Sequence, residues 1–272
     1  LHDRVENYGW NTTIPFTTQD WEMEFKFGGD FLTKARVAEN RRIAINTRAF
    51  ADGNTLSGNS FAAILSDSAF DNAMYSASQF LVRDTTLAVD DYSAAQKVDA
   101  FYLEADLFYQ DQWRFSGGAR FEDFRQAVVP MDPRTNQIDL SDEDDRAQLA
   151  FQEDDFYPAL AVTYIKDDSM QFRASVGETV VRPDLREVSS ATYIDPLTEF
   201  PVAGTPGLLT TSIIIYDLRW EWYREAGNNL SIGVFYKDMT NPIESVQSPA
   251  QDGPPLIRIA NAEPGSLTGV EI

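Results

Sequence analysis

The sequence has no cysteine and only one histidine, His2, among its 272 residues. Without cysteine the chain cannot form disulfides, thiolate zinc sites or a cysteine nucleophile. One histidine at the end of the chain excludes histidine-based catalytic triads and metal sites built from several histidines. Carboxylate chemistry is all that remains for an enzyme, and we expect no bound cofactor.

Basic residues are also scarce, with 22 Lys and Arg against 43 Asp and Glu and a formal net charge of −21. A protein that binds nucleic acid needs Lys and Arg to replace the counterions of the phosphates. The charge balance therefore argues against a nucleic-acid partner.

Long apolar runs are absent as well. A membrane-spanning helix needs about 20 consecutive apolar residues, and no segment of the sequence approaches that length. The strands of a membrane β-barrel alternate apolar and polar residues, so this test does not detect them.

Strict alternation is what the sequence has in abundance. In residues 21–27 the odd positions are apolar and the even positions are charged, a period of two that a strand presents and a helix does not. The alternation resumes over residues 31–37. Because glycine accepts the positive φ that tight turns need, residues 28–30 (Gly-Gly-Asp) are predicted to be a turn, and the two runs a hairpin.

The same hairpin pattern recurs, and a ninth strand is predicted within 256–272. The further hairpins are 101–109 with 113–121, 158–164 with 170–176, and 218–222 with 230–236. Turns within pairs are short, but the connections between pairs are long: 39–97, 126–154, 182–212 and 239–255. Structureless loops beyond about 15 residues are uncommon in compact domains. We therefore predict an all-β, antiparallel transmembrane β-barrel with long extracellular loops and short periplasmic turns.

Two other folds also fit the alternation. One is a soluble β-sandwich that binds carbohydrate, with its apolar residues facing a core. The other is a small, complete barrel of about ten strands acting as a pore or adhesin. Runs of about 9–11 residues favour membrane strands. In such a barrel, carboxylate pairs such as Glu22 with Glu24 are lumenal charges and not the acid–base pair of a glycosidase, so we do not expect an enzyme.

Aromatic residues lie towards the ends of the predicted strands, on the apolar face. Trp and Tyr favour the boundary between lipid and water. We predict that six residues are membrane-interface aromatics: Trp21, Phe27, Trp113, Trp220, Trp222 and Tyr236.

One segment carries a family resemblance. Residues 173–184 read RASVGETVVRPD, which resembles the C-terminal half of TonB-dependent outer-membrane receptors. In that family a Ser/Thr-rich strand runs into an Arg-Pro pair before a long extracellular loop, and here the pair is Arg182-Pro183. Residues 204–208, 216–223, 232–243 and 261–272 continue the resemblance in order and spacing. Thr205 and Gly207 replace the family's usual Asn and acidic residue.

The resemblance implies a 22-stranded barrel, of which this chain supplies about nine strands. Residues 1–272 are accordingly expected to be a segment of the receptor barrel, without the plug domain and the TonB box. It further implies a location in the outer membrane of a Gram-negative bacterium. The implied activity is import of a scarce nutrient (siderophore, haem, cobalamin or oligosaccharide) bound at the external loops. The implied partners are TonB with the inner-membrane energising complex, acting through the plug, and outer-membrane lipid and lipopolysaccharide.

Two of the predicted loops carry candidate binding residues. In the third loop we interpret five residues as ligand contacts: Arg182, Asp184, Arg186, Tyr193 and Asp195. The alternative is that Arg182 lines the wall beside a lumenal carboxylate and that Pro183 ends the strand. In the second loop, an acidic run includes three possible calcium ligands, Asp142, Asp144 and Asp145. That run lacks the regular spacing and turn glycine of a dedicated calcium loop, so a solvated acidic loop is the other interpretation.

Overall fold

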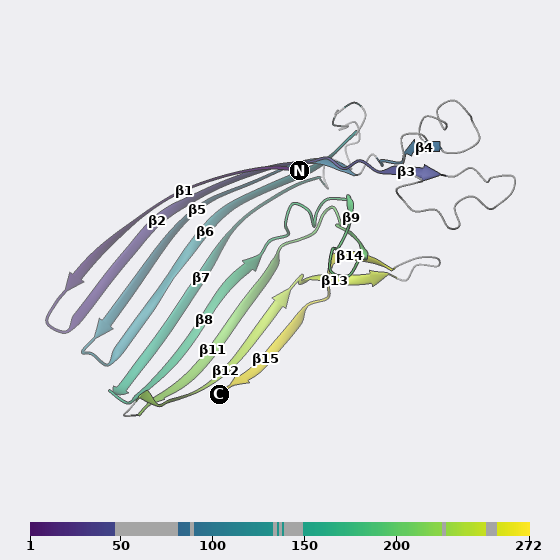
Figure 1. The fold of residues 1–272 in the computed structure, drawn as a ribbon. Helices are drawn as coiled ribbons and strands as arrows, with labels where there is room; N and C mark the ends of the chain where they lie inside the picture. Colours follow the sequence, from purple (N-terminus) through teal and green to yellow (C-terminus); the bar gives the residue numbers. More distant parts are fainter. Residues whose placement is uncertain are drawn as a thin grey trace.

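A nine-stranded antiparallel sheet dominates the computed structural model, which describes residues 1–46, 81–87, 90–132, 135, 138, 149–224, 227–248 and 255–272. The strand order is β1-β2-β5-β6-β7-β8-β11-β12-β15, and β1 and β15 are the open edges (Figure 1). The bounds are β1 His2–Thr17, β2 Trp21–Ala38, β5 Asp91–Tyr109, β6 Trp113–Met131, β7 Ala150–Asp167, β8 Met170–Val181, β11 Thr211–Tyr223, β12 Asn229–Thr240 and β15 Gly265–Glu271.

All the long connections lie at one end of the sheet and all the short turns at the other (Figure 1). Three of the long connections contain short strands of their own. These are β3 (Ile43–Asn46) and β4 (Leu81–Asp84), β9 (Thr192–Ile194) and β10 (Pro201–Ala203), and β13 (Ile243–Ser248) and β14 (Leu256–Asn261). The prediction of long loops on one side is confirmed.

The predicted turn at residues 28–30 is wrong. Strand β2 runs without a break through Gly28 and Gly29, and its hairpin partner is β1, a strand that the sequence pattern did not reveal. A Cβ at Gly28 would meet the backbone oxygen of Trp10 and the side chain of Tyr102. Gly28 therefore serves a close approach within the sheet, and no turn is required.

The segment predicted as a ninth strand is two strands in two sheets. Strand β14 belongs to a four-stranded sheet in the order β13-β14-β10-β9, whereas β15 pairs with β12 in the main sheet. Asn261 is the last residue of β14, and its side chain is hydrogen-bonded to the backbone of Leu209 and Asn241. The count of nine strands in the main sheet is correct only because the missed β1 offsets the false division of β2.

The two faces of the main sheet differ in character. One face is apolar and exposed: Leu103, Phe156 and Leu218 are 62%, 63% and 57% exposed. A soluble β-sandwich buries such a face against a second sheet, and within the described residues nothing covers it. At the level of these residues, charged side chains such as Glu104 and Arg120 lie on the opposite face. It also holds the buried residues near the loops, such as Ala100 and Phe124. No helix in the described part of the chain is long and apolar enough to span a membrane.

A row of six aromatic side chains crosses the exposed face near the short turns. Each residue pairs directly with the next across neighbouring strands, in the order Trp21, Tyr109, Trp113, Tyr164, Phe172 and Trp220. The ring centroids of Trp113 and Tyr164 are 4.6 Å apart, as are those of Trp21 and Tyr109. Such a row is the geometry of an aromatic girdle.

A second aromatic row lies towards the loops. It consists of Trp10, Phe101, Phe121 and Phe156, with Gly29 filling the position on β2. Along β5, β6 and β7, eight residues separate the two rows, which is about 27 Å along a strand. At a strand tilt near 40° this is about 20 Å along the membrane normal, close to the apolar band of outer-membrane barrels.

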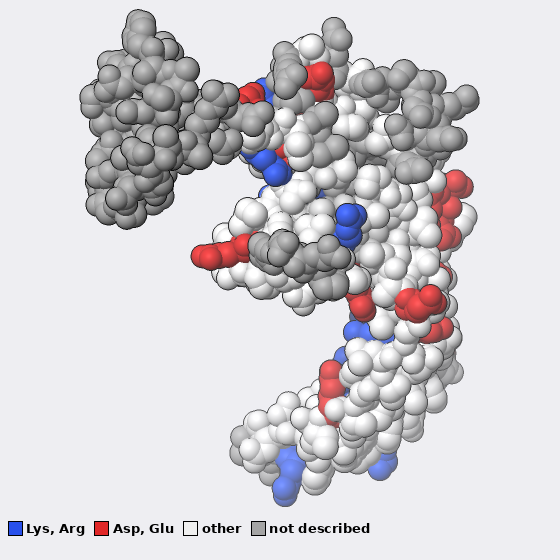
Figure 2. Space-filling model, turned by 90° about the vertical axis from the view of Figure 1, so that its right-hand side faces the viewer, with Lys and Arg blue, Asp and Glu red and all other residues white. Residues whose placement is uncertain are grey.

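Beyond the second row the exposed face becomes charged. The next row holds Asp99, Asp123 and Asp154, and the one after it holds Lys97 and Arg125. In the side view of Figure 2, acidic side chains gather on the convex surface towards the loops, while the surface below them is largely uncharged. The two aromatic rows therefore bracket an apolar band with a sharp upper limit.

The six predicted interface aromatics have different positions relative to these rows. Trp21, Trp113 and Trp220 belong to the row near the turns, and Trp222 stacks on Trp220 with ring centroids 6.4 Å apart. Phe27 and Tyr236 lie between the rows: Phe27 pairs with Leu103, and Tyr236 pairs with Tyr216 in the middle of the band. Their role at the interface stays a prediction.

Candidate functional site

The connection 182–210 folds inward from the end of β8 and packs on the charged inner face of the sheet. Arg182 forms an ion pair with Glu122 of β6 and donates a hydrogen bond of 3.0 Å from a terminal guanidinium nitrogen to the Tyr157 hydroxyl. Its guanidinium lies 4.5 Å from the centroid of the Phe124 ring. The Arg182 side chain is 13% exposed and that of Glu122 is 9% exposed. Arg182 thus lines the wall beside a lumenal carboxylate, as the alternative interpretation of the sequence described.

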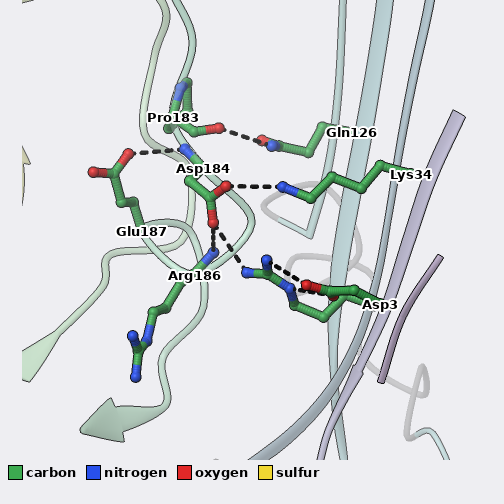
Figure 3. Close-up of polar contacts among 8 residues, drawn as sticks. Asp3, Lys34, Gln126, Pro183, Asp184, Arg186 and Glu187 are labelled. Atoms are coloured by element: carbon green, nitrogen blue, oxygen red, sulfur yellow. Dashed lines mark hydrogen bonds and ion pairs between the residues drawn. The ribbon is translucent and has the colours of Figure 1, made fainter. Parts of the chain in front are cut away.

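The next residues continue across the wall. The Gln126 side-chain amide donates a 3.0 Å hydrogen bond to the carbonyl of Pro183, and this contact is buried (Figure 3). Leu185 has no exposed surface and packs in a cluster with Tyr92, Ala94, Val128 and Ala191. The inward fold of the loop is therefore fixed by apolar burial as well as by polar contacts.

Asp184 reaches the far side of the wall, at β2. Its two carboxylate oxygens accept hydrogen bonds of 3.0 Å each from Lys34 and Arg36, and the second guanidinium edge of Arg36 binds Asp3 of β1 (Figure 3). Burial alone would raise the pKa of Asp184. The backbone N–H of Arg186 and the ammonium of Lys34 outweigh burial and hold that pKa below its usual range.

Arg186 and Tyr193 form an exposed pair at the loop end of the sheet, which we call the mouth. The guanidinium carbon of Arg186 lies 3.3 Å from the centroid of the Tyr193 ring, a cation–π contact. In Figure 3 the Arg186 side chain points away from Asp3 and Lys34. No ion pair involving Arg186 is found among the described residues, so its guanidinium donors face solvent.

Asp195 closes a tight turn between β9 and β10. Its carboxylate accepts hydrogen bonds from the Leu197 backbone N–H (2.9 Å) and the Thr198 hydroxyl (2.9 Å), which lower its pKa. The structure thus brings Arg186 and Tyr193 together, places Arg182 and Asp184 in contact with other strands, and keeps Asp195 within its own turn. A ligand-binding role for any of the five stays a prediction.

The external loops are joined to one another. The parallel pairing of β10 with β14 ties the connection 182–210 to the connection 241–264. Arg42, at the base of the first loop, donates to the carbonyl of Thr192 (3.0 Å) and to the Asp90 carboxylate (2.6 Å), which is fully buried. The neighbouring pair of Arg41 and Asp91 repeats this arrangement at 2.6 Å. The described parts of three connections at the loop end of the sheet are therefore in contact with one another.

Sequence reasoning missed a hollow in the inner wall below the mouth. Tyr102, Arg120 and Tyr157 are consecutive cross-strand partners, and below them the wall is built from small residues such as Gly118 and Ala159. The hollow has a volume of about 600 Å³. The signal was present in the sequence, because Tyr102 occupies a polar position of the alternation, where an aromatic residue stands out.

The possible calcium ligands Asp142, Asp144 and Asp145 lie outside the described residues, so that prediction is untested. Within the described ranges, no group of three or more acidic, His or Cys side chains is arranged to hold a metal ion.

Comparisons with known proteins were made for the sequence and for the fold. The family model for the TonB-dependent receptor-like β-barrel matches residues 2–272. A comparison with curated protein sequences gives no match.

Three solved structures share the fold over 98% of this chain. The ferric enterobactin receptor of Pseudomonas aeruginosa has 13% identity and a TM-score of 0.56, with 33% of its chain covered. The hemophore receptor of Serratia marcescens, solved with its hemophore and heme, has 12% identity and a TM-score of 0.57, with 39% covered. The ferric-catecholate import receptor of E. coli K12 has 9% identity and a TM-score of 0.58, with 34% covered.

These identities are too low to carry a ligand from one protein to another, and this chain spans about a third of the length of those structures. The family match, in contrast, extends over almost every residue and agrees with the alternating strands, the one-sided loops and the Arg182-Pro183 pair. The chain belongs to the β-barrel family of TonB-dependent receptors.

Proposed function

We propose that this chain forms part of the wall and external mouth of a receptor that captures a scarce nutrient and imports it across the outer membrane. The observation that carries the proposal is the inward fold of the connection 182–210, which lays polar side chains over a charged inner wall at the loop end of the sheet. A barrel that served only as a wall would not require a loop that folds inward and places charged side chains at this end of the sheet. Import is powered by TonB and the inner-membrane energising complex, acting through a plug domain inside the barrel.

The exposed pair of Arg186 and Tyr193 supports a proposal for the nutrient class. Arg186 stacked on Tyr193 offers guanidinium donors beside an aromatic ring, which suits a ligand with acidic oxygens on a planar group. A ferric siderophore fits that description best, and haem, with its two carboxylates, comes second. The guanidinium of Arg186 would contribute less to the binding of cobalamin or of an oligosaccharide.

The nine strands are one sector of a larger closed barrel of 22 strands. Support comes from the open edges, where β1 exposes Tyr8, Trp10 and Phe16 and β15 exposes Val270. An open edge invites pairing with another strand. Further strands of the same receptor would satisfy both edges, and the solved neighbours are about three times as long as this chain.

Ligand binding by the purified full receptor tests the proposal. We expect ferric enterobactin or haem to quench tryptophan fluorescence at submicromolar concentration. Arg186→Ala should weaken binding about tenfold, since a hydrogen bond to a charged group contributes about 1.5–3 kcal/mol. Arg224→Ala is the matched control, because Arg224 also lies over an aromatic ring, Trp222, but at the turn end of the sheet. Absence of binding to siderophore, haem, cobalamin and oligosaccharide alike would contradict the proposal.

A further inference from the structure

We infer that residues 182–185 are a fixed brace across the inner wall, and that Glu122 is the positioning residue that holds it. The brace sets where the Arg186–Tyr193 pair stands at the mouth. The consequence for ligand binding rests on the proposed function, but the brace itself does not.

The path of the segment is the first argument. It leaves β8, whose neighbours in the sheet are β7 and β11. Within four residues it contacts the inner faces of β7 (Tyr157), β6 (Glu122 and Gln126) and β2 (Lys34). Through Arg36, Asp184 is also connected to β1. A surface loop that merely joins β8 to β11 has no reason to cross this much of the wall.

The second argument is burial. Pro183 and Leu185 are fully buried, and the side chains of Arg182 and Glu122 are almost so. A buried ion pair offers little net stability, but removing one partner leaves an uncompensated charge. The pair therefore constrains the position of the loop, because a displaced loop would leave the buried guanidinium of Arg182 without its carboxylate partner.

Glu122 is shared between the brace and its own strand. One carboxylate oxygen accepts from Arg182 of the brace, and the other binds Arg120, 2.5 Å away, on its own strand. Arg120 in turn lines the hollow below the mouth and lies 3.5 Å from Asp30 of β2. Glu122 thus connects the connection 182–210 to the wall of the hollow. A displacement of either Arg182 or Arg120 changes the hydrogen bonds of the same carboxylate.

Amide hydrogen exchange of the full receptor in detergent micelles, without ligand, tests the brace. We expect Glu122→Gln to accelerate exchange at residues 183–192 about 100-fold or more, the loss expected when a buried charge loses its partner. Arg182→Gln should also accelerate exchange there, but by less, because Glu122 stays paired with Arg120. The double variant should exchange no faster than Glu122→Gln alone, because both substitutions remove the same interaction. Glu104→Gln, on the same inner face but paired with Lys26 of β2, should leave these amides unchanged.

Two results would overturn the brace. One is unchanged exchange at 183–192 in both single variants. The other is acceleration spread equally over β6 and β8, which would show that the pair supports the wall in general. A third variant separates this inference from the proposed function: Arg186→Ala should lose ligand while keeping the protection of 183–192, so ligand loss alone leaves the brace standing.

Discussion

At the scale of single residues, the position of the connection 182–210 depends on ion pairs between residues far apart in the chain. Arg182 and Asp184 stand out as charges beside a proline, but their partners Glu122 and Lys34 lie 60 and 150 residues away in the chain. No local pattern links such distant positions. Exposed Arg186 was indistinguishable from buried Arg182 in sequence, because burial here is a property of the folded loop.

The pH dependence of the brace belongs to this scale. The pKa of Asp184 is lowered in the folded state, so its contribution is present above the usual Asp pKa of about 3.9 and is lost as the pH falls through the lower folded value. The facing groups are Lys34, Arg36, Asp3 and the carboxylate of Glu187, which accepts from the Asp184 backbone N–H.

We therefore expect the protection of residues 183–192, corrected for intrinsic exchange, to be constant from pH 7 to about pH 4 and to fall only in more acidic solution. Asp184→Asn should show reduced protection already at pH 7 and a smaller acid step than the parent. The step that remains is the loss of the Glu122–Arg182 pair when Glu122 is protonated. A parent protein that loses protection between pH 7 and pH 5 would contradict the assignment to Asp184.

At the scale of strands, the alternation of apolar and polar residues predicted most of the sheet. The prediction failed where the glycine pair was given more weight than the odd–even register of the apolar positions. The apolar positions before and after residues 28–30 are all odd-numbered, so the alternation never breaks. A hairpin turn usually interrupts that register, whereas a continuous strand preserves it. The glycine pair suggested a turn, but the unbroken phase favoured the single strand β2. Strand β1 was missed although Tyr8, Trp10, Ile14 and Phe16 share one face, because Thr12 interrupts their alternation.

The limits of the apolar band can be tested on one strand. Leu160 and Asp154 both lie on the exposed face of β7, Leu160 midway between the aromatic rows and Asp154 just beyond the upper row. An arginine costs about 2–4 kcal/mol at the middle of a bilayer and about 0–1 kcal/mol near its surface. We expect Leu160→Arg to lower the free energy of unfolding in lipid vesicles by the larger amount and Asp154→Arg by the smaller.

The free energy of unfolding is measured for both variants and for the parent by titration with guanidinium chloride. Equal losses for the two substitutions would show that the aromatic rows do not mark the edges of the membrane.

At the scale of the whole molecule, three features are all typical of the wall of an outer-membrane β-barrel: the one-sided loops, the exposed apolar band and the charged inner wall. The TonB-dependent receptor family consists of outer-membrane transport proteins, so the predictions of an outer-membrane location and of a chain that is not an enzyme are confirmed at the level of the family. Ligand identity was beyond prediction, because it depends on how the external loops fold together. Their joining through Arg42 and through the pairing of β10 with β14 has no signature in the sequence.

Heat-modifiable mobility of the native polypeptide, isolated from the outer membrane and run in detergent gels with its intact mass, tests the central claim most directly. A closed receptor barrel predicts a compact band without heating, a slower band after boiling, and a mass well above the 30.6 kDa of this chain. A protein of about 30.6 kDa that is soluble without detergent and shows no shift would contradict the account.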